Sequence, residues 1–316
     1  MNPVSPAGFQ IIAVENLRMN LNTDEQLSYG SVNMWRRFLI LLKISRPPLW
    51  IALPLVFCMG LAYGQRGLTD PSFRFTPLII LQMCLLSFPL CLFTFGLNDV
   101  HDHVSDQMNP RKKGIEGIRL ETRDHRMVKI AAFWVGVVFL CVSAATANLA
   151  NVYFAVTILC LSYVYSTPPW RLKIRPPFDV VSAGILGFFA PFALGYSFVD
   201  DATALPLQAY YFTCCVMGFH AFSTIMDYDV DKRIGDRTFA VACGKRAAAL
   251  FPAAIFLCSL FIVRVNYIKI FFMACLVLFI VVAAIPSERI ARYSFLAMFL
   301  GAVAIVSVWI ASFVLR

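Results

Sequence analysis

Nine apolar segments, each long enough to cross a lipid bilayer, dominate the sequence. A helix needs about 20 mostly apolar residues to span the hydrocarbon, and within lipid it satisfies all of its own backbone hydrogen bonds. Only 14% of the residues are charged, against about 25% in soluble domains. We therefore predict an all-α, polytopic membrane bundle of about nine transmembrane helices. The segments lie near 47–64, 75–98, 127–147, 149–166, 178–198, 206–226, 247–264, 267–285 and 293–314.

The N-terminal segment has a different composition from the rest of the chain. Residues 1–26 are polar and lack the basic-then-apolar order of a signal peptide. We predict a polar N-terminal tail over residues 1–35, followed by a single transmembrane domain over residues 36–316.

Lys and Arg residues are distributed unevenly between the two sides of the predicted bundle. If the nine segments alternate in direction, 22 of the 27 basic residues lie on the side of the N-terminus and five on the other side. Because basic loops are retained in the cytoplasm, we predict a cytoplasmic N-terminus and a C-terminus on the opposite side. Anionic lipids account for much of the net charge of +9, so the expected partner is the lipid bilayer and no nucleic acid is needed.

Acidic residues crowd together where the second apolar segment ends. In the stretch NDVHDHVSD, residues 98–106, Asp99, Asp102 and Asp106 follow i, i+3, i+7 spacing, which places them on one face of a helix. Asn98 lies four residues before Asp102 and joins that face. The charge imbalance of the loops places this cluster on the cytoplasmic side of the membrane.

A second acidic cluster, DYDVD, follows the sixth apolar segment on the same side. Asp227 and Asp231 have i, i+4 spacing and share a helical face, whereas Asp229 points away from it. Both clusters are predicted at the C-terminal ends of helices, where the macrodipole disfavours anions, so a cation is needed to offset them. Oxygen ligands with few imidazoles or thiols suit Mg²⁺.

Basic residues lie near both clusters in the sequence. Arg111 follows the first cluster and Lys232 lies within the second, and the loop YSTPPWRLKIRP, residues 165–176, contributes Arg171 and Lys173. Carboxylates for a metal ion, combined with guanidinium and ammonium groups for phosphate oxygens, indicate a diphosphate site. A single acidic loop would most simply be a solvated surface, but two clusters with helical spacing and basic neighbours favour a functional site.

Three motifs together resemble the UbiA superfamily of membrane prenyltransferases. NDVHDHVSD is similar to its NDxxDxxxD motif, DYDVD to its DxxxD motif, and YSTPPWRLKIRP to its YSxPPxRxK loop, in the same order along the chain. The resemblance covers residues 36–316. It implies nine helices around a central cavity, an enzyme that transfers prenyl groups, an allylic isoprenoid diphosphate as substrate and Mg²⁺ as cofactor, with the site open to the cytoplasm.

The resemblance also implies a role for each matching residue. Two Mg²⁺ ions are expected, one at each acidic motif, and the same aspartates are expected to be catalytic. The implied metal ligands are Asp99, Asp102, Asp106, Asp227 and Asp231, and the implied diphosphate ligands are Asn98, Arg111, Lys173, Arg171 and Lys232.

His220 is a further catalytic candidate, because ionisation of an allylic diphosphate leaves a carbocation whose final proton needs an acceptor. It lies seven residues before Asp227, and in a continuous helix it would share a face with that residue. A histidine within a membrane span is costly unless it has a partner. Contact with the acceptor, deprotonation and a purely structural role all remain open for it.

The hydrophobic acceptor is the least determined part of this prediction. NPRKKGIEG, residues 109–117, and HAFSTIMDYDVD, residues 220–231, resemble the branch that adds C5 units to lycopene, which implies a carotenoid acceptor. The chain departs from that branch at VHDH, residues 100–103, and in the extra acid Asp229. A UbiA-type terpene cyclase and an aromatic or quinone-precursor prenyltransferase are alternatives with the same metal site. A transporter is disfavoured, because its ionisable residues would lie near the membrane midplane.

Overall fold

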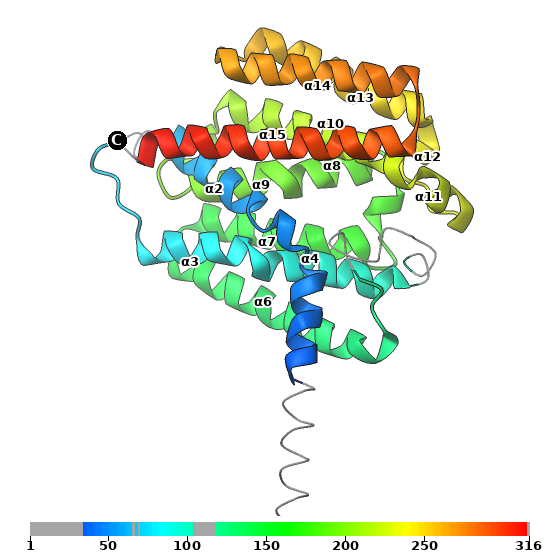
Figure 1. The fold of residues 1–316 in the computed structure, drawn as a ribbon. Helices are drawn as coiled ribbons and strands as arrows, with labels where there is room; N and C mark the ends of the chain where they lie inside the picture. The colour runs from blue at the N-terminus through cyan, green and yellow to red at the C-terminus, as the bar shows by residue number, and fades with distance from the viewer. Residues whose placement is uncertain (1–33, 65–66, 69, 104–105, 107–117, 315–316) are drawn as a thin grey trace, which may run out of the picture.

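The computed structural model describes residues 34–64, 67–68, 70–103, 106 and 118–314, which form an all-helical bundle (Figure 1). Most of the predicted N-terminal tail therefore lies outside the described residues. Within these ranges, seven helical segments are long and apolar enough to cross a membrane. They are Pro77–His101, Thr122–Ala145, Leu149–Ser166, Phe178–Tyr196, Lys245–Ile262, Asn266–Ala284 and Glu288–Ser312.

Breaks in the helix lie just before the first predicted span and at the end of the sixth. The first predicted span, 47–64, corresponds to Pro47–Tyr63, which is bent by 51° against a preceding helix, Met34–Ile44. Arg46, at the bend, has a φ of 54°, and two prolines that follow it cannot continue the hydrogen bonding of a helix. The sixth is a helix of 17 residues that passes into a 3-10 turn, Thr224–Asp227. By length and composition the described chain thus has seven spans, or eight if the bent pair is one span, where the sequence predicted about nine.

The helices run roughly parallel or antiparallel to one another. The end of the bundle at which α4, α7 and α10 terminate, on the right in Figure 1, is called the motif end below. The helices are α2 (Ala52–Tyr63), α3 (Pro77–Leu86), α4 (Phe88–His101), α6 (His125–Ala145), α7 (Leu149–Ser166), α8 (Phe178–Gly184), α9 (Ala190–Tyr196), α10 (Leu207–Ser223), α11 (Tyr228–Ile234), α12 (Phe239–Cys243), α13 (Lys245–Ile262), α14 (Asn266–Ala284) and α15 (Glu288–Val314).

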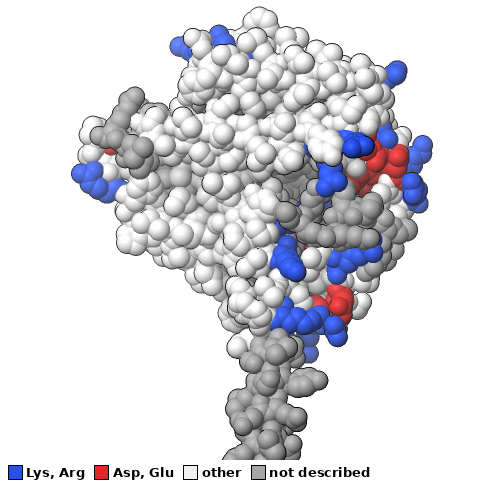
Figure 2. All heavy atoms as spheres, viewed as in Figure 1, with Lys and Arg blue, Asp and Glu red and all other residues white. Residues whose placement is uncertain are grey.

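The lateral surface of the bundle is apolar. Phe133 on α6 is 62% exposed, Phe261 at the end of α13 is 86% exposed, and Val308 on α15 is 71% exposed. In Figure 2 the Lys, Arg, Asp and Glu side chains gather mainly at the motif end, and most of the visible lateral face is uncharged. At 1.5 Å per residue, the 21 residues of α6 extend about 31 Å, close to the ~30 Å thickness of a bilayer's hydrocarbon core.

Helices α2 and α9 pack with their backbones in direct contact. A Cβ on Gly60 would lie 2.0 Å from the carbonyl oxygen of Phe192, and a Cβ on Gly195 would lie 2.1 Å from the carbonyl oxygen of Phe57. Each helix therefore contributes one glycine against the other's backbone. Small residues allow this close approach, on which packing between helices in lipid depends.

A cluster of hydrogen-bonded polar side chains connects four helices at the end opposite the motif end. The side chains of Gln82, Ser143 and Asn151 are fully buried. The Gln82 amide donates to the Ser143 hydroxyl at 2.7 Å and to Asn151 Oδ1 at 2.8 Å. Asn151 donates in return to Gln82 Oε1 at 3.0 Å and to the Ser197 hydroxyl at 3.2 Å. The polar atoms thus satisfy one another across α3, α6, α7 and the end of α9.

The glycine contact predicts a steric effect at Gly195. We expect Gly195→Ala to lower the melting temperature of the detergent-purified protein by several degrees, because overpacking costs about 1–3 kcal/mol. Gly136→Ala on α6 is the matched control, since its Cβ would meet the Phe93 side chain at 3.4 Å, an ordinary contact, and alanine favours the helix. Equal melting temperatures for the two variants would contradict the packing described here.

Candidate active site

The first acidic motif lies at the end of α4. Asp99 is fully buried in the last turn of the helix, and its Oδ1 is 3.3 Å from Nη2 of Arg46. The Arg46 guanidinium also lies over the ring of Phe95, 4.3 Å from its centroid. Asp102 is the C-cap of the helix, and the N–H of the buried Asp106 donates to its carbonyl at 2.8 Å. Cations thus compensate carboxylates that the helix dipole disfavours.

The loop after α7 brings a lysine onto this motif. The ammonium group of Lys173 forms an ion pair with Oδ2 of Asp102 and donates a hydrogen bond of 2.9 Å to Oδ1 of Asn98. The hydroxyl of Ser166, the last residue of α7, donates to the same amide oxygen at 3.2 Å. Asn98 therefore accepts hydrogen bonds and helps to place Lys173 beside Asp102.

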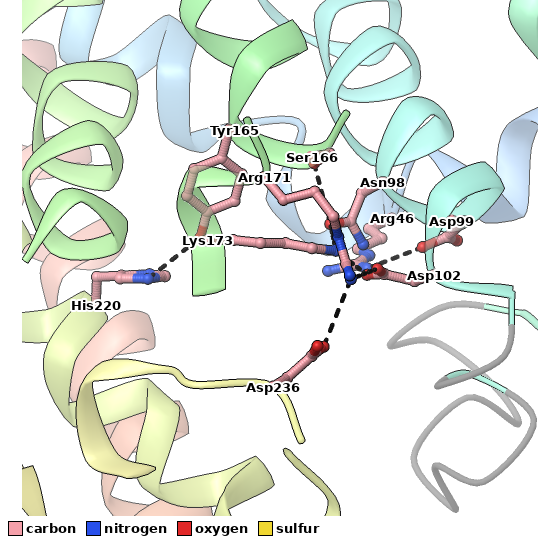
Figure 3. Close-up of polar contacts among 10 residues, drawn as sticks. All are labelled: Arg46, Asn98, Asp99, Asp102, Tyr165, Ser166, Arg171, Lys173, His220 and Asp236. Atoms are coloured by element: carbon pink, nitrogen blue, oxygen red, sulfur yellow. Dashed lines mark hydrogen bonds and ion pairs between the residues drawn. The ribbon is translucent and has the colours of Figure 1, made fainter. Parts of the chain in front are cut away.

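Arg171 connects the two acidic parts of the sequence. Its Nη2 lies 3.3 Å from Oδ1 of Asp102 and 3.5 Å from Oδ2 of Asp236, five residues beyond the second motif (Figure 3). The residue has a φ of 39°, in the left-handed region that non-glycine residues seldom adopt. The loop after α7 therefore contacts both the first acidic motif and the segment that follows the second.

The second motif lies on a separate short helix rather than at the end of the sixth span. Asp227 is the N-cap of α11, and Asp229 and Asp231 lie in its first turn. The sequence predicted these acids at a helix C-terminus. The 3-10 turn Thr224–Asp227 instead ends the span, and α11 begins with its positive dipole end next to the carboxylates, which is favourable.

Asp231 has a distinctive electrostatic environment. The hydroxyl of Thr238 donates to its Oδ2 at 3.0 Å. Burial and then the neighbouring carboxylate of Asp227 raise the pKa of Asp231 to about 7. A cation close to this carboxylate would stabilise the charged form and lower that pKa, so the motif is suited to a cationic partner.

Two further predicted diphosphate ligands, Lys232 and Arg111, are not placed with the residues above. Lys232 is exposed, and its Nζ lies 5.7 Å from the ring centroid of Tyr228. Arg111 lies outside the described residues. Arg46 and Asp236 were not predicted as site residues, because Arg46 lies in a basic segment before the first span and Asp236 lies beyond the DYDVD motif.

His220 has a partner. Its Nε2 lies 3.2 Å from the hydroxyl of Tyr165, near the end of α7, and in the view of Figure 3 the pair lies across Lys173 from Asp102. The prediction that His220 shares a helical face with Asp227 rested on a continuous helix. Because α10 ends at Ser223, that geometric argument does not hold.

The donor set fits a hard divalent cation bound together with a phosphorylated ligand. Within the described ranges, no three His, Cys, Asp or Glu side chains are gathered closely enough to hold a metal ion alone. Mg²⁺ does not require such a cage, since it keeps several waters and is often bound by one or two carboxylates plus phosphate oxygens. Asp102 and Asp231 supply carboxylates, and Arg171 and Lys173 are suited to phosphate.

Comparison with known proteins decides the family. The model of the UbiA prenyltransferase family matches residues 51–295, which is most of the chain. This chain belongs to the UbiA prenyltransferase family. It is accordingly a multi-pass integral membrane enzyme, as the sequence predicted.

Relatives of similar sequence include two lycopene elongase/hydratases. A lycopene elongase/hydratase of Halobacterium salinarum is 31% identical over 222 residues, 70% of this chain and 78% of the relative. Another of Haloferax volcanii is 31% identical over 220 residues, 69% of each chain.

Solved structures share the fold. A UbiA homologue from Archaeoglobus fulgidus bound to DMAPP and Mg²⁺ has a TM-score of 0.58 at 18% identity, covering 85% of this chain and 99% of that one. The same homologue bound to GPP and Mg²⁺ has a TM-score of 0.58 at 17% identity, covering 86% and 99%. The all-helical fold predicted from the sequence is confirmed.

The pairing of Lys173 with Asp102 predicts a stability effect. We expect Lys173→Met to lower the melting temperature of the purified protein by several degrees, because losing one partner of a largely buried pair costs up to about 3 kcal/mol. Arg175→Met in the same loop is the control, since Arg175 is exposed and its guanidinium donates to the backbone carbonyl of Pro169 rather than to a carboxylate. A Lys173→Met protein as stable as the Arg175→Met protein would contradict the pairing.

Proposed function

We propose that this enzyme uses Mg²⁺ to ionise an allylic isoprenoid diphosphate and transfers the prenyl group to a hydrophobic acceptor, a carotenoid of the lycopene type. The observation that carries the proposal is the Arg171 bridge from Asp102 to Asp236. It joins the first acidic motif to the segment that follows the second, so that carboxylates and phosphate-binding cations share one end of the bundle.

The site residues follow from this arrangement. Two Mg²⁺ ions, one at each motif, would supply Lewis-acid neutralisation of the leaving diphosphate. Lys173 and Arg171 can exchange contacts with Asp102 for contacts with phosphate oxygens, because both bind either anion. We assign as metal ligands Asp99, Asp102, Asp106, Asp227 and Asp231, and as diphosphate ligands Asn98, Arg171, Lys173, Lys232 and Arg111, the last of these outside the described residues.

The reaction is a balanced substitution followed by loss of a proton. The allylic C–O bond breaks, and both of its electrons leave with the diphosphate. A terminal alkene of the acceptor then donates its π electrons to the allylic carbon, which forms a C–C bond and leaves a tertiary cation. That cation loses a proton to a base or takes up water and then loses a proton.

His220 is the base that we assign to the last step. Its hydrogen bond with Tyr165 holds the imidazole in place, and a neutral imidazole can accept a proton. The phenol would orient the ring and share the resulting positive charge. Both residues lie within one turn of the motif ends of their helices, on the side where the diphosphate would leave.

The carotenoid acceptor is supported by the relatives. Lycopene elongase/hydratases match about 70% of this chain, and their name joins the two fates open to the tertiary cation, elongation and hydration. The excess of Lys and Arg on the motif side supports a cytoplasmic N-terminus, a C-terminus across the membrane and a site open to the cytoplasm.

Membranes containing this chain, supplied with Mg²⁺, DMAPP and lycopene, should yield carotenoids lengthened by C5 units. Chromatography with mass spectrometry measures the products. A cyclised hydrocarbon formed from labelled diphosphate without lycopene would favour the cyclase instead. Lengthening of an aromatic acceptor but not of lycopene would favour the quinone-precursor enzyme.

The metal ligands can be tested one carboxylate at a time. We expect Asp102→Asn and Asp231→Asn each to lower the turnover rate by about 100-fold or more, since each removes an anionic ligand near the developing charge. Asp70→Asn, in a loop at the opposite end where the Asp70 carboxylate accepts hydrogen bonds from Ser72, should retain wild-type turnover. Full activity of both motif variants would refute the proposed metal site.

The base can be tested by product distribution. We expect His220→Phe to release diphosphate but to shift the products from alkene towards hydrated carotenoid, because proton removal slows while water can still add. His220→Gln should shift them as much, since its side-chain amide can still bond to Tyr165 but cannot accept a proton. An unchanged ratio of alkene to hydrated product would exclude His220 as the base.

A further inference from the structure

The helix that carries the second motif is only partly buried. None of the seven residues of α11 is fully buried, although Tyr228 packs against the hydrophobic core. The helix ends at Gly235, whose φ of 83° reverses the chain in a conformation that glycine adopts freely. The direction in which Asp227 and Asp231 point therefore depends on polar contacts as well as on packing.

A polar clamp, formed by Lys245 and Glu288, holds the N-terminal turn of α11. Oε1 of Glu288, the first residue of α15, accepts the backbone N–H of Asp229 at 2.9 Å. The ammonium group of Lys245, the first residue of α13, lies 3.1 Å from the same oxygen and 3.2 Å from Oδ1 of Asp229. It also lies 4.5 Å from the ring centroid of Tyr228.

These contacts give the extra acid of DYDVD a role. Asp229 is directed towards Lys245 and the clamp, on the other side of α11 from the predicted pair Asp227 and Asp231. Lys245 is 20% exposed and Glu288 30% exposed, so the clamp is partly shielded from water. An ion pair that also fixes a backbone N–H restrains orientation more than a freely exposed pair does.

We propose that Lys245 and Glu288 are positioning residues, which fix α11 against α13 and α15 and thereby set the Mg²⁺ affinity of the second motif. Neither residue touches the substrate or the metal in this proposal, and Asp229 serves as the anchor on α11. The inference rests on the proposed function, because it takes Asp227 and Asp231 as metal ligands. It predicts that loosening the clamp weakens metal binding more than it slows the reaction.

The test uses Glu288→Gln and Lys245→Met in the full-length membrane protein. We expect the Mg²⁺ concentration for half-maximal activity to rise about tenfold, in the range of coupling between contacting residues. The turnover rate at saturating Mg²⁺ should stay within about twofold of wild type. Mn²⁺ binding to the purified protein with inorganic pyrophosphate, followed by electron paramagnetic resonance, should weaken by a similar factor.

Controls separate positioning from a general loss of structure. Arg246→Met changes the exposed neighbour of Lys245. It should leave unchanged both the Mg²⁺ concentration for half-maximal activity and the affinity for Mn²⁺. The double variant should bind the metal ion no more weakly than the single variant that binds it less tightly, because the two residues act as one unit. If either single variant proves unstable, the near-isosteric Asp229→Asn should weaken Mn²⁺ binding in the same direction.

The outcomes distinguish this inference from the proposed function. If Mn²⁺ binds the wild-type protein with pyrophosphate but binds the clamp variants equally well, the clamp does not position the motif and the metal site stands. A fall in turnover at saturating Mg²⁺ without weaker Mn²⁺ binding would likewise overturn the inference. A wild-type protein that needs no divalent cation would instead overturn the function on which it rests.

Discussion

The compensation of Asp102 by two cations from one loop is the interaction on which the motif end depends. A carboxylate at the C-terminus of a helix faces the negative end of the dipole, and burial makes its charge still more costly. Lys173 and Arg171 offset both effects. Because Arg171 also reaches Asp236, the pairing that stabilises one helix end also brings the second motif's segment to it.

The cations beside Asp102 can exchange a carboxylate partner for a phosphate partner. Arginine and lysine bind carboxylate and phosphate with similar geometry, so the groups that neutralise Asp102 are also those that would take hold of a diphosphate. The paired state keeps the site ordered, and the same side chains remain available to a ligand. Arg46, stacked on Phe95 and paired with Asp99, extends this arrangement to the entry of the first span.

The sequence was sufficient to predict the helical class, the family and most of the polar residues at the motif end. Long apolar runs and a fixed order of short motifs are local signals, and they can be recognised in a sequence without knowledge of how the helices pack. Asn98, Lys173 and Arg171 were predicted as diphosphate ligands. The structure places Lys173 against Asn98 and Asp102 and Arg171 against Asp102, and their binding of diphosphate stays a prediction.

The positions at which helices are interrupted could not be predicted from the sequence, because tertiary packing determines them. The break after Ser223 sits within a run that reads as a single helix, and it moves Asp227 to the start of α11. Arg46 and Asp236 were missed for a related reason. Only the folded chain shows that Arg46, before the first predicted span, contacts Asp99 at the end of the second, and that Asp236 contacts Arg171. The Lys245–Glu288 clamp joins positions 43 residues apart and has no local signal.

The buried cluster of Gln82, Ser143 and Asn151 has a consequence for the mechanics of the molecule. Its mutual hydrogen bonds lie far from the motifs and hold four helices where the motif end offers mostly ion pairs and a short helix without buried residues. In the described part of the bundle, one end is therefore joined by buried hydrogen bonds between neutral side chains, which do not depend on charge, whereas the other is joined largely by ion pairs, which added salt or a bound anion can weaken.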